Sequence, residues 1–386
     1  MGLLSLDKYN CILSISMRLI DKDKHGNMSL FHGVAGDILL LNELLPEDTN
    51  GLIEGKILEM LFTLQNNLEL CSSLNFNEGF AGILYTYAYL TNIGIIETDD
   101  DFYSPFDEYF EQYIQALAEI KNYDLLCGLI GFGIYYIERA KKQLAMKRYV
   151  YKILEYILSM AVEVDDFAYW VYSLESHPRL KEQEEWAYLG TLHGMPSVMS
   201  FLLICIKEGY TTEKLVIMLR KGFNTVLMGV TEQSGFSFAE SLFVKDKCFY
   251  SDNQKITNLF YCNGDLGIIN LFFEGFKVLN DKSYYDIAQN AFLKLSPRFT
   301  HKNEFSSYCM CHGWAGLLYF IHKYGFMDKM NAERYNSISS NIVKRLFVYL
   351  RKENIEPGYL TGYNGIILAL LSTERKTCLD RILLLS

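Results

Sequence analysis

Residues 312–316 read "HGWAG", and patterns of this kind occur seven times in the chain of 386 residues. The others are "HGVAG" at 32–36, "EGFAG" at 78–82, "CGLIG" at 127–131, "HGMPS" at 193–197, "NGDLG" at 263–267 and "TGYNG" at 361–365. Their first glycines are separated by 46, 49, 66, 70, 49 and 49 residues. Self-similarity at a period of about 20–50 residues is typical of repeat architectures.

Each motif opens a stretch that is apolar on nearly all sides, such as "GIINLFFEGF" at 267–276, which predicts a buried helix. An amphipathic stretch precedes each motif, as in "FDEYFEQYIQALAEI" at 106–120, with apolar residues at three- and four-residue steps. The pattern therefore predicts seven buried helices alternating with seven amphipathic ones.

We expect an all-α fold, an (α/α)7 toroid with seven inner and seven outer helices; an open α-solenoid is the alternative. The glycines would let backbones approach closely. The two long intervals indicate insertions near 163–190 and 231–257, which do not read as helix. No segment has the composition of a linker, so residues 1–386 are predicted to form a single domain.

Composition narrows the class of protein. The net charge of −10 argues against a nucleic-acid partner. We expect neither a signal peptide nor a transmembrane segment, because Asp7 and Lys8 interrupt the start and no apolar run reaches about 18 residues. Nine cysteines without regular spacing predict no disulfide framework and favour a cytoplasmic location.

Chemically active side chains lie just before the glycines, at one end of the predicted ring. They are His32, Asp124, Cys127, His193, Cys262, Cys311 and His312. Two thiolates and an imidazole, from Cys262, Cys311 and His312, are typical zinc ligands. Three protein ligands with an open position are the pattern of a catalytic zinc site, and we expect one zinc ion per chain.

Each of these residues also has a structural interpretation. A cysteine such as Cys262 often packs as a small apolar side chain. His193 alone is compatible with a hydrogen-bonded structural histidine, and Asp124 with a cap of the helix that follows.

The sequence resembles the lanthionine synthetase C-like family, the lantibiotic cyclases. The resemblance rests on "YCNG" at 261–264 with "CHG" at 311–313, supported by "LHG" at 192–194 and "DLLCGLIG" at 124–131. It implies an α/α toroid with a central zinc held by Cys262, Cys311 and His312. It also implies His193 as the acid/base group and Asp124 as its carboxylate partner.

The resemblance implies a cytoplasmic enzyme that adds cysteine thiols to dehydroalanine or dehydrobutyrine in a dehydrated precursor peptide, which forms lanthionine and methyllanthionine thioether rings. The implied partners are a dehydratase and a transporter, in a maturation complex at the membrane. A zinc- and thiol-binding or scaffold protein of the same fold is the alternative. An unrelated α/α toroid, such as a glycosidase, is a third, although no carboxylate pair occupies the motif positions.

The sequence departs from the family pattern beside the first predicted ligand. Tyr261 stands where the family commonly has tryptophan, and Asn263 where it has tyrosine or histidine. Asn258 replaces a frequent arginine, with Lys255 the nearest basic residue upstream. These departures indicate a divergent member.

Overall fold

The computed structural model describes residues 6–22, 26–171, 185–231, 237–251, 258–301, 304–352 and 354–386. The principal elements in these ranges are α-helices. They are α1 (Leu6–Lys22), α2 (Val34–Leu44), α3 (Leu52–Asn66), α4 (Phe80–Asn92), α5 (Asp100–Glu119), α6 (Leu129–Ala140), α7 (Lys147–Ser159), α8 (Met195–Lys207), α9 (Glu213–Leu227), α10 (Asp265–Leu279), α11 (Lys282–Leu295), α12 (Trp314–Tyr324), α13 (Ala332–Leu350), α14 (Tyr363–Leu371) and α15 (Leu379–Ile382). None of these helices is long and apolar enough to cross a bilayer.

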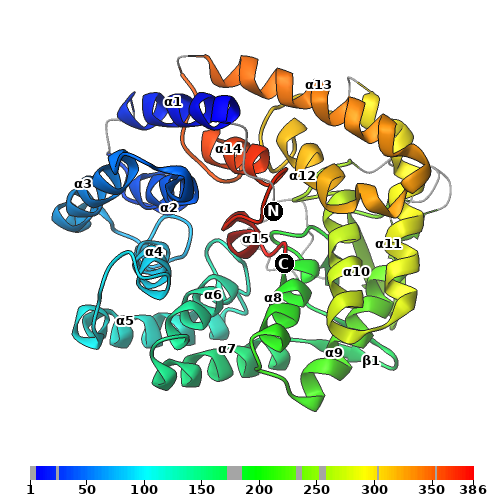
Figure 1. Cartoon of the computed structure of the whole chain (residues 1–386). Helices are drawn as coiled ribbons and strands as arrows, with labels where there is room; N and C mark the ends of the chain where they lie inside the picture. Colours follow the sequence, from blue (N-terminus) through cyan, green and yellow to red (C-terminus); the bar gives the residue numbers. More distant parts are fainter. Residues whose placement is uncertain are drawn as a thin grey trace. The chain divides into compact units, whose positions relative to one another are not determined.

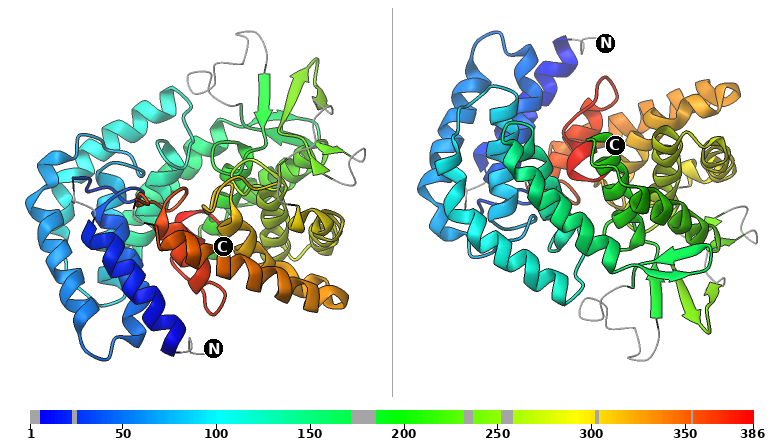
Figure 2. Two further views of the ribbon diagram at one scale, coloured as in Figure 1. Left: turned by 90° about the horizontal axis from the view of Figure 1, so that it is seen from above. Right: turned by 90° about the horizontal axis from the view of Figure 1, so that it is seen from below.

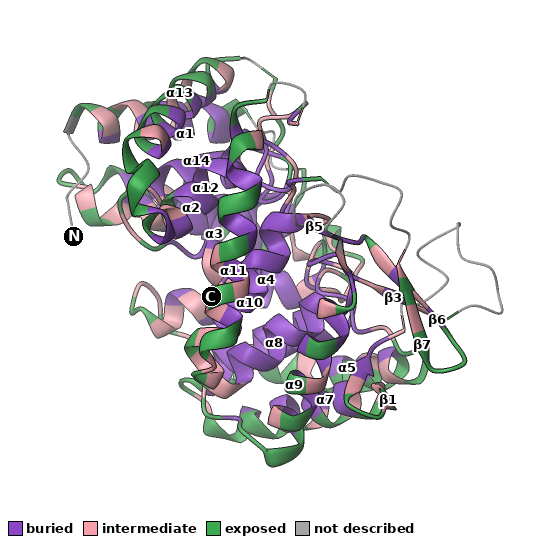
Figure 3. Ribbon diagram, turned by 90° about the vertical axis from the view of Figure 1, so that its right-hand side faces the viewer, coloured by how far each residue is buried: buried purple, intermediate pink, exposed green. Residues whose placement is uncertain are grey.

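The predicted alternation of helices is confirmed. The seven even-numbered helices α2 to α14 each begin within a motif, at the residue after its first glycine. They are buried over most of their length. The odd-numbered helices α1 to α13 each bury one side only. Figure 3 shows this contrast, with purple dominating helices such as α2, α8 and α14.

The chain divides into two compact units. The first comprises residues 1–98 and 305–382 and holds α1 to α4 and α12 to α15. Within it α14 contacts both α2 and α12, so the last repeat lies against the first (Figure 1). The Tyr363 hydroxyl and the Asn364 amide each donate to Asp37 at 2.8 Å. Since an open solenoid leaves its first and last repeats apart, the solenoid alternative is wrong.

The second unit comprises residues 99–304 and 383–386 and holds α5 to α11. Its buried helices are neighbours in sequence order, because α8 contacts α6 on one side and α10 on the other. Each is backed by an amphipathic helix, as α6 is by α7 and α10 by α11.

Short antiparallel strands occupy the described parts of the two long intervals. They are β1 (Val162–Val164), β2 (Phe167–Tyr169), β3 (Glu185–Tyr188), β4 (Val230–Thr231), β5 (Ser237–Phe238), β6 (Ser241–Lys245) and β7 (Cys248–Ser251). The strands pair as β1–β2, β4–β5 and β3–β6–β7. Figure 2 shows β3, β6 and β7 projecting from the helices of their unit. The insertion boundaries and the single-domain organisation remain predictions.

The motif glycines are required where the chain folds back on itself. A Cβ atom on Gly365 would lie 2.0 Å from the carbonyl oxygen of Tyr359, six residues earlier. The same approach occurs at Gly82, where the atom would lie 2.1 Å from the Phe76 carbonyl. At these positions the missing side chain leaves room for the loop that precedes the buried helix. The sequence alone predicts only that backbones approach closely.

This crowding predicts opposite effects for two glycine substitutions in the first unit. Gly365→Ala should lower the free energy of unfolding by about 1–3 kcal/mol, because its methyl group has no room. Gly55→Ala is the matched control: Gly55 lies on α3, and a Cβ there would meet nothing within 4 Å. That change should raise stability by about 0.5–1 kcal/mol. Urea unfolding followed by circular dichroism checks both, and a Gly365→Ala protein as stable as the wild type would contradict the crowding.

Candidate functional site

The loops before α8 and α10 are joined by backbone and side-chain hydrogen bonds. The Thr191 amide donates to the Cys262 carbonyl at 2.8 Å, and the Thr191 hydroxyl donates to the Tyr261 carbonyl. The Tyr261 hydroxyl donates in turn to the Leu383 carbonyl. Cys262 and His193 are thus carried by two loops that are fixed to each other.

Asp124 and His193 form a close pair in the second unit. His193 Nδ1 lies 2.5 Å from Asp124 Oδ2. The other oxygen, Oδ1, accepts the amides of Leu126 at 2.7 Å and Cys127 at 3.0 Å. The side chain of Asp124 is 11% exposed and that of His193 is 39% exposed, so the carboxylate is enclosed and the ring is open to solvent on one side.

These contacts distinguish the two interpretations of Asp124 from the sequence, as a cap of the following helix or as the carboxylate partner of His193. Helix α6 begins after Gly128 and has no side-chain cap. Asp124 instead binds amides of its own loop and the imidazole of His193. The interpretation of Asp124 as a helix cap is therefore wrong.

The pair stabilises its own charges. Burial favours neutral Asp124, but the hydrogen bond and charge of His193 and the amides of Cys127 and Leu126 outweigh it, so its pKa is lowered. Burial also opposes protonation of His193, yet the hydrogen bond and charge of Asp124, with a contribution from Cys262, raise the pKa of His193. A carboxylate facing Nδ1 holds the proton on that nitrogen and leaves Nε2 for proton exchange.

Cys311 and His312 lie in the loop before α12, which begins after Gly313. The Cys311 amide donates to the Leu360 carbonyl at 2.9 Å, and Cys311 is buried. Because neither residue is helical, the divergence of about 100° between adjacent helical side chains does not apply to them.

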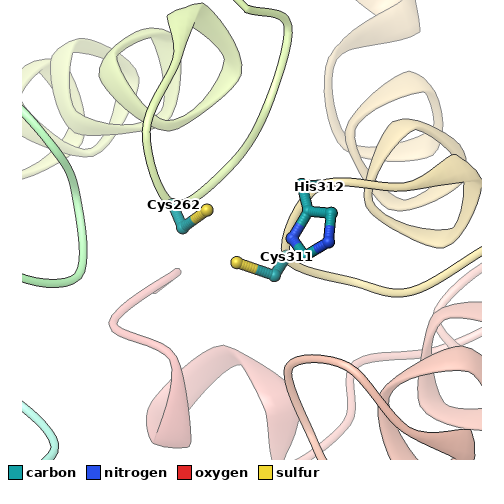
Figure 4. Close-up of side chains that lie close together, drawn as sticks. All are labelled: Cys262, Cys311 and His312. Atoms are coloured by element: carbon teal, nitrogen blue, oxygen red, sulfur yellow. The ribbon is translucent and has the colours of Figure 1, made fainter. Parts of the chain in front are cut away.

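The ligand atoms of Cys262, Cys311 and His312 all lie within 4.8 Å of one another (Figure 4). In tetrahedral zinc sites the Zn–S bond is about 2.3 Å and the Zn–N bond about 2.0 Å, which sets ligand atoms about 3.3–3.8 Å apart. The donor set of two thiols and one imidazole fits zinc. The limit of 4.8 Å exceeds the tetrahedral spacing by about 1 Å, so the three side chains would have to draw together around an ion. Within the described residues no other such group of His, Cys, Asp and Glu occurs, and His32 belongs to none.

The residues that depart from the family pattern have structural partners. Tyr261 is buried and bonded through its hydroxyl. The Asn263 amide donates to Glu240 Oε1 at 2.8 Å. Asn258 is exposed, and its carbonyl accepts the Asp265 amide at 3.0 Å. Lys255 lies outside the described residues.

Sequence reasoning missed Glu240 and Thr191. Glu240 lies between β5 and β6, and the buried Asp265 fixes this region to the start of α10 by accepting the Phe238 amide at 2.8 Å. Neither Glu240 nor Thr191 occupies a motif position, so no spacing in the sequence marks them.

Comparison with known proteins identifies a family for this chain. The family described as "Lanthionine synthetase C-like protein" matches residues 24–384. No curated protein matches the chain.

Two solved structures show the fold. Nisin cyclase superposes with a TM-score of 0.76 at 20% identity, over 99% of this chain and 98% of that one. An inactive variant of an α-1,6-mannanase of Salegentibacter sp. HEL1_6, in complex with α-1,6-mannotriose, superposes with a TM-score of 0.50 at 8% identity, over 98% and 99% of the two chains. The chain has the α/α-toroid fold predicted from the repeats.

The coupling of Asp124 and His193 predicts a change in titration. Replacing Asp124 with asparagine removes the charge and the carboxylate hydrogen bond that raise the pKa of His193, while burial still lowers it. The pKa of His193 should therefore fall in Asp124→Asn, as measured by NMR of the imidazole protons.

His322 is the internal control, because its pKa does not depend on Asp124. Burial and the charge of Lys8 lower the pKa of His322, and the charge of Glu374 raises it. An unchanged pKa at His193, or an equal shift at His322, would contradict the assignment.

Proposed function

Because the chain belongs to the lanthionine synthetase C-like family, we propose that it is a zinc-dependent peptide cyclase that forms thioether rings. The observation that carries the proposal is the grouping of Cys262, Cys311 and His312 within 4.8 Å. The pair of Asp124 and His193 supplies the second requirement, a group that can move a proton.

The three grouped residues would hold the metal. When bound, zinc deprotonates a coordinating thiol, whereas a free cysteine with a pKa of about 8.5 is largely protonated at neutral pH. Two thiolates and one imidazole leave a fourth position for the cysteine of the substrate.

In the proposed reaction the substrate sulfur bonds to the β-carbon of dehydroalanine or dehydrobutyrine. The carbon–carbon double bond opens, and the electron pair moves toward the carbonyl. The α-carbon then needs a proton. We assign its delivery to Nε2 of His193, which has first accepted the proton that the substrate thiol loses. Asp124 keeps Nδ1 protonated and the ring in position, so that each turnover returns the imidazole to the same state.

The substrate we propose is a dehydrated, cysteine-containing precursor peptide. The reaction that supplies it must remove water from serine or threonine, so a dehydratase would be a partner. A transporter would act on the product. We propose that the cyclisation takes place in the cytoplasm, with the protein in contact with a maturation complex at the membrane.

Zinc binding provides the first test. The purified chain should contain about one zinc ion, and replacing Cys262, Cys311 or His312 with alanine should reduce the metal content sharply, because each change removes one of three ligands. Cys309→Ala is the matched control, since Cys309 is also buried but belongs to no metal-ligating group among the described residues. Metal analysis by mass spectrometry checks these values. Full zinc content in all three variants would refute the ligand assignment.

Ring formation provides the second test. His193→Ala should retain zinc but close rings about 10²–10⁴-fold more slowly, as is typical for loss of a general acid–base group. Asp124→Ala should show an equal or smaller loss if it only orients the ring. Because cyclisation leaves the peptide mass unchanged, free thiols are alkylated before mass spectrometry.

An enzyme-free reaction corrects for spontaneous thiol addition. A wild-type protein that binds zinc and thiols, yet never exceeds this background on the dehydrated peptide encoded beside its gene, would favour the alternative of a binding or scaffold protein.

A further inference from the structure

Besides the thiols of Cys262 and Cys311, a third thiol, that of Cys127, lies against the pair of Asp124 and His193. Cys127 Sγ lies 3.4 Å from Asp124 Oδ1, within the range of a sulfur hydrogen bond. The same oxygen accepts the amides of Leu126 and Cys127, whereas Oδ2 faces His193 Nδ1. The two oxygens of one carboxylate are thus divided between the loop and the imidazole.

This thiol is not part of the core. Cys127 is exposed, as is Cys248 on β7, whereas Cys205 is buried. An exposed thiol in such a place is a hazard for a protein that handles electrophilic alkenes. Its sulfur would bond to the β-carbon of a dehydro residue, a proton would pass to the α-carbon, and the peptide would become covalently attached.

The environment of Cys127 suppresses that reaction. Although the residue Cys127 reaches solvent, its sulfur is partly desolvated. This desolvation, the charge of Asp124 and the hydrogen bond to Asp124 raise the pKa of Cys127 to about 12, and the hydrogen bond of Asn122 opposes the shift. Because the thiolate is the nucleophile, a thiol held in the protonated form reacts slowly.

We propose that Cys127 is a positioning residue for Asp124: its S–H group donates to Oδ1, holds Oδ2 toward His193, and by the same contact stays protected from the unsaturated residues of the substrate. This inference rests on the proposed function for its purpose. The contact itself is independent of that function and is tested separately.

The first experiment measures alkylation of the full chain as purified. Iodoacetamide at pH 8 is followed by peptide mapping, and the rates at Cys127 and Cys248 are compared in one sample. Cys127 should react at least about tenfold more slowly than Cys248, since each unit of pKa changes the thiolate fraction tenfold. In Asp124→Asn the rate at Cys127 should rise roughly tenfold for the same reason, while Cys248 stays unchanged.

Cys205 reports on the fold in this experiment, because it should remain unlabelled in both proteins. Equal labelling of Cys127 and Cys248 in the wild type would overturn the proposed contact, whether or not the protein is a cyclase.

The second experiment leaves Asp124 intact. Cys127→Ala removes one donor to Oδ1 and should lower kcat for ring closure about threefold to tenfold, the range for one hydrogen bond. Cys127→Ser keeps a donor and should stay within about twofold of the wild type, since a hydroxyl also donates to a carboxylate. Both variants should retain zinc.

An equal loss in both variants, or no loss in either, would overturn the positioning role. An inactive wild type would instead refute the proposed function, and the alkylation rates would still decide whether Asp124 holds the thiol.

Discussion

The close approach of the helix start to the loop before it, at Gly36, Gly82, Gly267, Gly316 and Gly365, is the constraint on which the structure depends. At Gly36, Gly267 and Gly316 a Cβ atom would lie 2.2–2.3 Å from a carbonyl oxygen six residues earlier. The chain can therefore turn from loop into buried helix within one tight bend. Ser197, in the fourth repeat, has a side chain at this position, and its hydroxyl donates to the Gly194 carbonyl at 2.7 Å.

This bend determines where reactive groups can lie. Residues just before the first glycine belong to a loop held against its own helix, so their backbone is fixed although it is not helical. Cys262 and His193 occupy such positions, and Thr191 joins their loops through the Cys262 carbonyl. A rigid loop end suits a site that must hold side chains in one geometry, because ordering them again at each turnover would be costly.

Hydrogen bonds from these loops also keep a buried carboxylate of the second unit ionised. Burying a carboxylate is unfavourable unless its oxygens are hydrogen-bonded. Asp124 meets this condition with two loop amides, the Cys127 thiol and the imidazole of His193. The carboxylate then remains ionised in a place where burial alone would favour its neutral form, and the raised pKa of His193 is the reciprocal result.

The sequence by itself determined the repeat, the alternation of buried and amphipathic helices and the residues at the loop ends, because these follow from local periodicity and from glycines at fixed spacing. Position before the motif glycines singled out seven reactive residues. Ligand chemistry and the resemblance to the family then assigned roles to Cys262, Cys311, His312, His193 and Asp124. Only the tertiary structure decided the contact of α14 with α2, the choice between cap and imidazole partner for Asp124, and the hydrogen bonds of Thr191, Glu240 and Cys127. Except for the contact of Cys127 with Asp124, which lies within one loop, those contacts join separate segments of the chain. Periodicity within one segment carries no information about which segments meet.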